Sequence, residues 1–151
     1  PFDLSKDWGR SDNDQRHRLV ANGTFQLRAI QFGGTLLAYS APPFNITSGV
    51  TTVQGTAGRP IVNGQFIERN AGEGTPFVSV NARVSYTMKF ASRWQCELLA
   101  EGFNLTDHVN VITRNTNFGS GTYPTNPSPT YGQITAVGDP RVFQFGARVR
   151  F

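Results

Sequence analysis

The sequence has few of the residues that usually hold a small fold together or mark a known chemistry. It contains one cysteine, Cys96, which excludes an internal disulfide and a zinc site built from cysteines. No apolar run approaches the roughly 18 residues that a membrane-spanning helix requires, so a helical membrane protein is excluded. Charged residues make up 16% of the chain and hydrophobic residues 38%. This balance is typical neither of disorder nor of a coiled coil.

Lysine is also scarce, occurring only at Lys6 and Lys89, and the other positive charges are arginines spread along the whole chain. The net charge is +4, yet no basic patch stands out, so we expect no nucleic-acid partner. Glycine (16), proline (9) and phenylalanine (12) are abundant, which favours β-structure with long turns. The 151 residues are enough for one domain. Because the chain begins at Pro1 and its only methionine is Met88, we expect a processed, truncated or partial sequence.

Alternation of apolar and polar residues predicts an all-β, antiparallel fold with five strands of about ten residues each. The clearest alternation runs from Val78 to Phe90, and a short turn at 91–93 leads to an alternating partner that begins at Trp94. We expect one partial β-barrel unit, divided into a loop at 1–15, a hairpin at 16–46, a long loop at 47–76, a hairpin at 77–105, a long loop at 106–140 and a C-terminal strand at 141–151.

The strand and loop lengths favour a transmembrane β-barrel over a soluble sandwich. Strands of soluble sheets average about five or six residues, whereas membrane-spanning β-strands need about 9–11. Membrane barrels also have short turns at one end, long loops at the other, a lipid-facing side and a polar lumen. The sequence fits each of these features. A soluble β-sandwich binding module, in which the apolar residues would form a core, is a weaker alternative.

We expect the apolar positions of the strands to face lipid or partner protein, and the charged positions between them to face a polar lumen. The lipid- or partner-facing set is Leu19, Phe25, Val78, Val80, Val84, Tyr86, Met88, Phe90, Trp94 and Leu98. The lumen-facing set is Arg83, Lys89, Glu97, Glu101, Arg148 and Arg150. Phe25, Tyr86, Phe90, Trp94 and Phe151 fall near predicted strand ends, where a membrane barrel places its aromatic girdle.

Two glutamates on one strand are the first candidates for chemistry. Glu97 and Glu101 are four residues apart, so they share a face but lie about 13 Å apart, too far for a glycosidase pair. Cross-strand ion pairs with arginine or lysine are the favoured interpretation. A charged channel wall that favours anionic solutes is the functional alternative.

Other candidate sites lack the spacing that their chemistry needs. His17 and His108 lie on different segments with no metal-binding motif between them. Asp12 and Asp14 could offer oxygens to calcium, but the loop lacks the glycine and late glutamate of an EF-hand. We therefore expect no catalytic residues, no metal and no cofactor, and thus no enzyme.

The C-terminal residues resemble the last strand of bacterial outer-membrane β-barrels, which ends in phenylalanine with apolar residues at alternate positions before it. In that class the last strand is recognised by the barrel-assembly machinery. The matching positions here are Phe143, Phe145, Ala147, Val149 and Phe151.

Three further segments resemble the end of TonB-dependent receptors, in the branch that carries an N-terminal carboxypeptidase-regulatory-like domain. They are Asp14-Gln-Arg-His-Arg-Leu-Val, Ala100-Glu-Gly-Phe-Asn-Leu-Thr-Asp-His and Tyr131-Gly-Gln-Ile-Thr-Ala-Val-Gly-Asp-Pro-Arg. Full receptors of this family have a barrel of about 22 strands, a plug and a TonB box. The resemblance covers the last five strands, and it implies a bacterial outer-membrane location, with import belonging to a parent protein.

Five strands are too few to close a barrel, because the smallest single-chain membrane barrels use about eight. An open sheet exposes unpaired strands at both edges. Either the rest of a receptor covers them, or further copies of the chain pair edge to edge into a homo-oligomeric barrel, a tube or an extracellular filament. The sequence therefore supports two functions, a wall segment of an outer-membrane receptor and a self-assembling structural subunit.

Overall fold

The computed structural model of the chain describes residues 7–53, 56–90 and 93–151 and is all-β. The chain divides into two compact units. The sheet unit comprises His17–Tyr39, Phe77–Asn110 and Gly138–Phe151. The loop unit comprises the described residues of 7–16, Ser40–Pro76 and Val111–Val137. Across the three described ranges, no helix is long and apolar enough to span a membrane.

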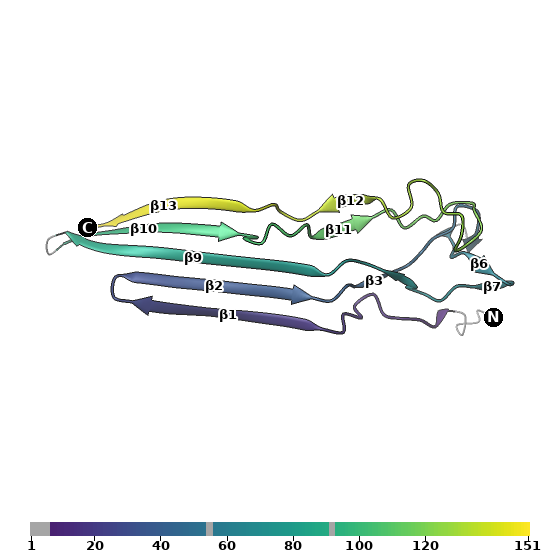
Figure 1. Cartoon of the computed structure of the whole chain (residues 1–151), viewed down its shortest axis with the longest axis horizontal. Coiled ribbons are helices and arrows are strands. Elements are labelled where there is room, and N and C mark those ends of the chain that lie inside the picture. The colour runs from purple at the N-terminus through teal and green to yellow at the C-terminus, as the bar shows by residue number, and fades with distance from the viewer. Residues whose placement is uncertain (1–6, 54–55, 91–92) are drawn as a thin grey trace. The chain divides into compact units, whose positions relative to one another are not determined.

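The sheet unit is a single five-stranded antiparallel sheet, in the order β1-β2-β9-β10-β13 (Figure 1). Its strands are β1 (Arg18–Leu27), β2 (Ile30–Tyr39), β9 (Phe77–Phe90), β10 (Trp94–Phe103) and β13 (Val142–Arg150). Each strand is antiparallel to its neighbours, so β1 and β13, which form the edges, run in the same direction. The predicted all-β class and the five long antiparallel strands are confirmed, and the sheet is not closed.

The first hairpin has a fixed register that the sequence did not define. β1 and β2 form an unbroken ladder of ten residue pairs, connected by the two residues Arg28 and Ala29. Arg28 adopts a φ of 53°, in the left-handed region that tight hairpin turns require. The Gly33-Gly34 pair lies inside β2, where Gly34 faces Gly23 of β1. In the second hairpin, the turn expected at 91–93 falls mainly on residues 91–92, which lie outside the described residues.

The two long connections contain short ladders that the sequence analysis did not predict. Three two-residue pairs lie between β2 and β9: β3 (Pro43–Phe44) with β8 (Gly72–Glu73), β4 (Thr52–Val53) with β5 (Thr56–Ala57), and β6 (Ile61–Val62) with β7 (Gln65–Phe66). A fourth ladder joins β11 (Val111–Arg114) to β12 (Ile134–Val137) with an irregular register. The turn between β6 and β7 is Asn63-Gly64, both with positive φ, which is a strong hairpin signal.

A small aromatic core organises the loop unit. Ile46 and Phe118 are the buried hydrophobic residues of the described chain, and both lie in this unit. The Phe118 ring, 2% exposed, meets the rings of Tyr123 and Tyr131 edge-to-face at centroid distances of 5.0 and 5.1 Å. The Phe118 amide also donates a hydrogen bond of 2.8 Å to the Thr47 carbonyl. These contacts tie the two long connections together, whereas no described apolar side chain of the sheet unit is buried.

Disrupting the aromatic core should change both the stability of the loop unit and the pKa of Tyr131. Burial raises the pKa of Tyr131 above the ordinary tyrosine value, so the folded loop unit loses stability as the pH rises past that value. Replacing Phe118 with alanine removes the ring against which Tyr131 packs. We expect Phe118→Ala to destabilise the loop unit by about 3–5 kcal/mol and to lower the pKa of Tyr131 toward its ordinary value.

Ultraviolet titration of tyrosine and limited proteolysis of residues 111–137 measure these two effects. Val50→Ala is the matched control, because Val50 belongs to the same unit and is 68% exposed. An unchanged tyrosine titration in Phe118→Ala would contradict the packing described here.

Candidate functional site: the two faces of the open sheet

The sheet has one face that is apolar across all five strands. The register aligns the alternating apolar positions of neighbouring strands, so they project to the same side. We call this side the apolar face; it contains Leu19, Ala21, Phe25, Leu27, Ile30, Phe32, Leu36, Ala38, Val78, Val80, Val84, Tyr86, Met88, Phe90, Trp94, Cys96, Leu98, Ala100, Phe143, Phe145, Ala147 and Val149. All the strand residues expected from the sequence to face lipid or a partner therefore share one side.

Large side chains of the apolar face are exposed. Phe145 is 81% exposed and Phe25 63%, and neither packs into a core. At the hairpin-turn end, Phe151 follows β13 and its ring lies 5.5 Å from that of Trp94. An exposed apolar surface that covers an entire sheet marks an interaction with lipid or protein.

The opposite side, which we call the polar face, carries all the charged residues predicted to face a lumen. Its polar residues are Arg18, Asn22, Thr24, Gln26, Gln31, Thr35, Ser79, Asn81, Arg83, Ser85, Thr87, Lys89, Gln95, Glu97, Glu101, Gln144, Arg148 and Arg150. The alternation is not perfect, because Val20, Leu37, Leu99 and Val142 also fall on this side.

Both glutamates of the polar face take part in cross-strand ion pairs. Arg83 of β9 lies 3.7 Å from Glu97 and 3.4 Å from Glu101, both on β10. Arg148 of β13 lies 3.8 Å from Glu97, and the Gln144 amide donates a hydrogen bond of 2.6 Å to Glu101. Each carboxylate therefore has a partner on both neighbouring strands. Such partly exposed pairs stabilise a sheet by only about 0–1 kcal/mol each, so they fix charge placement more than stability.

Two other cations of the polar face have no such partner. Lys89 and Arg150 lie opposite Gln95 from its two sides, and neither forms an ion pair with any residue in the described ranges. The structure therefore brings Arg83 and Arg148 to the two glutamates and leaves Lys89 and Arg150 without a carboxylate.

Aromatic residues on the polar face were not expected from the sequence. The Arg18 guanidinium lies 4.5 Å from the centre of the Tyr39 ring, and Tyr39 stacks on Phe77 at 5.5 Å. Further along the strands, a hollow of about 510 Å³ is lined by Gly33, Asn81, Arg83 and neighbouring strand residues. Gly33 contributes no side chain, and Arg83 is matched by two carboxylates. This part of the face is therefore polar but close to electrically neutral.

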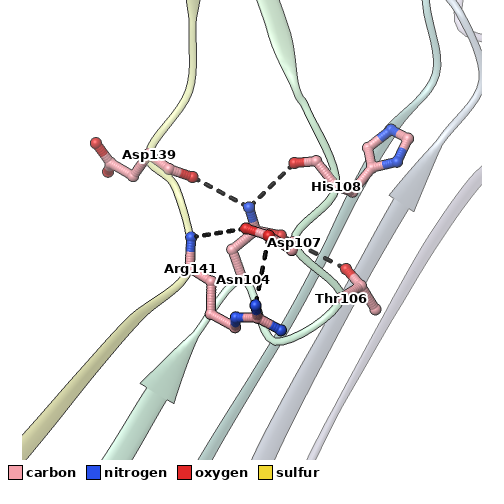
Figure 2. A network of polar contacts seen from close by, with 6 residues as sticks. All are labelled: Asn104, Thr106, Asp107, His108, Asp139 and Arg141. Atoms are coloured by element: carbon pink, nitrogen blue, oxygen red, sulfur yellow. Dashed lines mark hydrogen bonds and ion pairs between the residues drawn. The ribbon is translucent and has the colours of Figure 1, made fainter.

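An asparagine corner closes the end of the sheet unit where β10 ends and β13 begins (Figure 2). Asn104, 5% exposed, has a φ of 47°, and its side-chain nitrogen Nδ2 donates to the carbonyl oxygens of His108 (3.0 Å) and Asp139 (3.1 Å). Asp107 accepts hydrogen bonds from the backbone and the guanidinium of Arg141. Asparagine and aspartate tolerate positive φ, which is the signal in the sequence that could have predicted this corner.

Two more asparagines attach this corner to β9. The Asn81 side-chain oxygen accepts a 2.9 Å hydrogen bond from the Asn104 amide. Asn110, also 5% exposed, pairs with both backbone groups of Val78, accepting at 2.9 Å and donating at 2.8 Å. The side chains therefore take over the role of a strand ladder where regular pairing stops.

The residues considered for metal binding do not form a cluster. Across the described part of the chain, no group of three or more histidine, cysteine, aspartate or glutamate residues could hold a metal ion. Asp12 accepts a 2.6 Å hydrogen bond from Asn70. Asp14 forms an ion pair of 2.8 Å with Arg10, whose guanidinium lowers the pKa of that carboxyl. Asp12 therefore links the segment before β1 to Asn70 within the loop unit, whereas the pair between Asp14 and Arg10 is local.

Comparison with protein-family models, curated proteins and solved structures found no match for this chain. Functional inference therefore depends on the sequence and on the geometry of the two faces.

The asparagine corner can be tested by removing one side chain while preserving the backbone. Asn104→Gly keeps a residue that tolerates the positive φ but leaves two partly buried carbonyl oxygens without their donor. We expect a loss of about 1–3 kcal/mol in the free energy of unfolding, measured by urea titration in detergent micelles. Hydrogen exchange of amides 104–110 should accelerate as well. Asn22→Ala, on the exposed polar face, is the control, and equal stability of the two variants would contradict a structural role for the corner.

Proposed function

We propose that the sheet unit is a wall segment of a membrane-spanning β-barrel, of the outer-membrane TonB-dependent receptor type that the sequence resembles. The observation that carries this proposal is the apolar face, which spans five strands and has no covering layer within its unit. A water-soluble sheet has to bury such a face in a core. In a membrane barrel the same face contacts lipid, while the polar face lines the lumen.

The strand lengths support the same conclusion. β1, β2 and β10 have ten residues each, which is about 33 Å of extended chain. Tilted by about 40°, such a strand spans about 25 Å, the height of the apolar band of outer-membrane barrels. At the hairpin-turn end, Trp94 and Phe151 supply the aromatic pair that suits a membrane interface.

In this proposal the wall segment acts passively. The polar face offers a hydrated lining in which Arg83 is matched by two glutamates, and the long connections of the loop unit meet the extracellular ligand. Import belongs to the complete receptor, and the segment is not an enzyme and uses no cofactor.

The open edges of β1 and β13 favour a second candidate, a structural subunit that polymerises through them. Unpaired edge strands are ready templates for pairing with another chain. In that case copies of the chain would form a multi-chain barrel, tube or filament, with the apolar face against other copies.

Quenching by brominated lipid distinguishes these candidates. In a chain carrying Trp8→Phe and Trp94→Phe, a single tryptophan is introduced by Phe145→Trp on the apolar face or by Gln144→Trp on the polar face. The chain is reconstituted into phosphatidylcholine vesicles with brominated acyl chains. We expect strong quenching for Phe145→Trp and weak quenching for Gln144→Trp. A monomer that needs no detergent and shows no quenching would contradict both candidates, whereas rings or tubes seen by electron microscopy in detergent-free buffer would establish the structural subunit.

A charge placed on each face gives an independent prediction. Val84 lies near the middle of β9 on the apolar face, and Thr87 lies on the polar face of the same strand opposite Glu97. Val84→Arg should cost about 2–4 kcal/mol of membrane stability because it places a cation at the bilayer midplane. Thr87→Arg should change stability little, because its charge faces the lumen. Equal effects of the two variants on the fraction inserted into vesicles would overturn the proposed orientation.

A further inference from the structure

The polar face has an excess of positive charge where β13 ends. Two rows cross β9, β10 and β13 there. One contains Lys89, Gln95 and Arg150, and the next contains Thr87, Glu97 and Arg148. Glu97 is the only carboxylate in these rows, and it is already shared between Arg148 and Arg83.

The open side of β13 is where further carboxylates can reach these arginines. β13 pairs with β10 on one side, and no strand of the described residues pairs with its other side. Arg148 is 57% exposed at its side chain, and Arg150 is also exposed. In an antiparallel neighbour, the residues opposite these two positions would lie about 4.5–5.5 Å away, close enough for cross-strand charge pairs.

A second copy of this chain does not supply those carboxylates through its edges. The polar face of β1 carries Arg18, Val20, Asn22, Thr24 and Gln26, and that of β13 carries Val142, Gln144, Gly146, Arg148 and Arg150. Neither edge contains an acidic residue. Edge-to-edge pairing of copies would therefore leave the arginines opposite neutral or positive side chains.

Strand direction disfavours a head-to-tail contact between copies. Because β1 and β13 run in the same direction, a head-to-tail contact between copies would pair them in parallel. Every other pair in the sheet is antiparallel. An inverted copy could pair β13 with β13 in the antiparallel sense, but that contact would place the arginines of one copy opposite neutral or positive side chains of the other.

We propose that the free edge of β13 binds an antiparallel strand of different sequence, which carries aspartate or glutamate on its polar side opposite Arg148 and Arg150. This inference rests on the proposed function and defines the partner that the wall segment requires. It disfavours closure by copies of the same chain.

Three fluorescent ten-residue peptides test this inference on the full chain in detergent micelles. Each peptide alternates valine and threonine, and two threonines in its N-terminal half are replaced by glutamate, glutamine or lysine. Binding is measured by fluorescence anisotropy. At low salt we expect the glutamate peptide to bind about three- to tenfold more tightly than the glutamine peptide, and the lysine peptide to bind most weakly. High salt should reduce these differences.

Two double variants identify the residues responsible. Arg148→Gln with Arg150→Gln should abolish the preference for glutamate, and Arg148→Glu with Arg150→Glu should reverse it toward lysine. Arg16→Gln with Arg18→Gln removes the same charge outside β13 and should leave the preference unchanged. Far-ultraviolet circular dichroism checks that each variant retains its sheet.

Equal binding of the glutamate and glutamine peptides would overturn the inference, and so would binding of none of the peptides. Occupation of the β13 edge by a second copy, detected as a homo-oligomer that excludes every peptide, would also overturn it. The assay does not depend on a bilayer. If the peptide assay fails while Phe145→Trp is still quenched by brominated lipid, only the partner inference is wrong. If that quenching is lost, the proposed function is wrong.

Discussion

The sheet unit depends on burial of its apolar face against something outside the sheet. The hydrophobic effect is the main favourable contribution to folding, and here the side chains that could supply it gather on one exposed surface. The small core formed by Ile46 and Phe118 belongs to the loop unit, and no described apolar side chain of the sheet unit is buried. In the proposed function, lipid or neighbouring protein completes the stability of the sheet.

The polar face and the asparagine corner stabilise the sheet in different ways. The pairs between Arg83 and the two glutamates are partly exposed, so they contribute to charge placement rather than to stability. Asn104 and Asn110 are buried, and their hydrogen bonds satisfy backbone groups that no strand ladder reaches. One face of the sheet is thus polar, and hydrogen bonds from neutral side-chain amides stabilise the end of the sheet.

The sequence predicted the strands well because their alternation is a local property. A period of two over ten residues identifies both the strand and the side on which each residue lies, so the arginines and glutamates could be assigned to one face without coordinates. The ladder of β11 and β12 and the asparagine corner depend on contacts between distant segments and were missed. The Asn63-Gly64 turn carried a readable local signal, although it lies in a region expected to be a plain loop.

The long connections also determine the order in which the strands can form. β1 with β2 and β9 with β10 are local hairpins, which form in about 1–10 μs in isolated systems. β2 pairs with β9, and β13 with β10, only after the chain has closed one of the two long connections, and such non-local pairing is slow. We therefore expect both hairpins to form before either of these two ladders. The outer edge of β13, which carries Arg148 and Arg150, therefore becomes available for pairing only after the hairpin of β9 and β10 has formed.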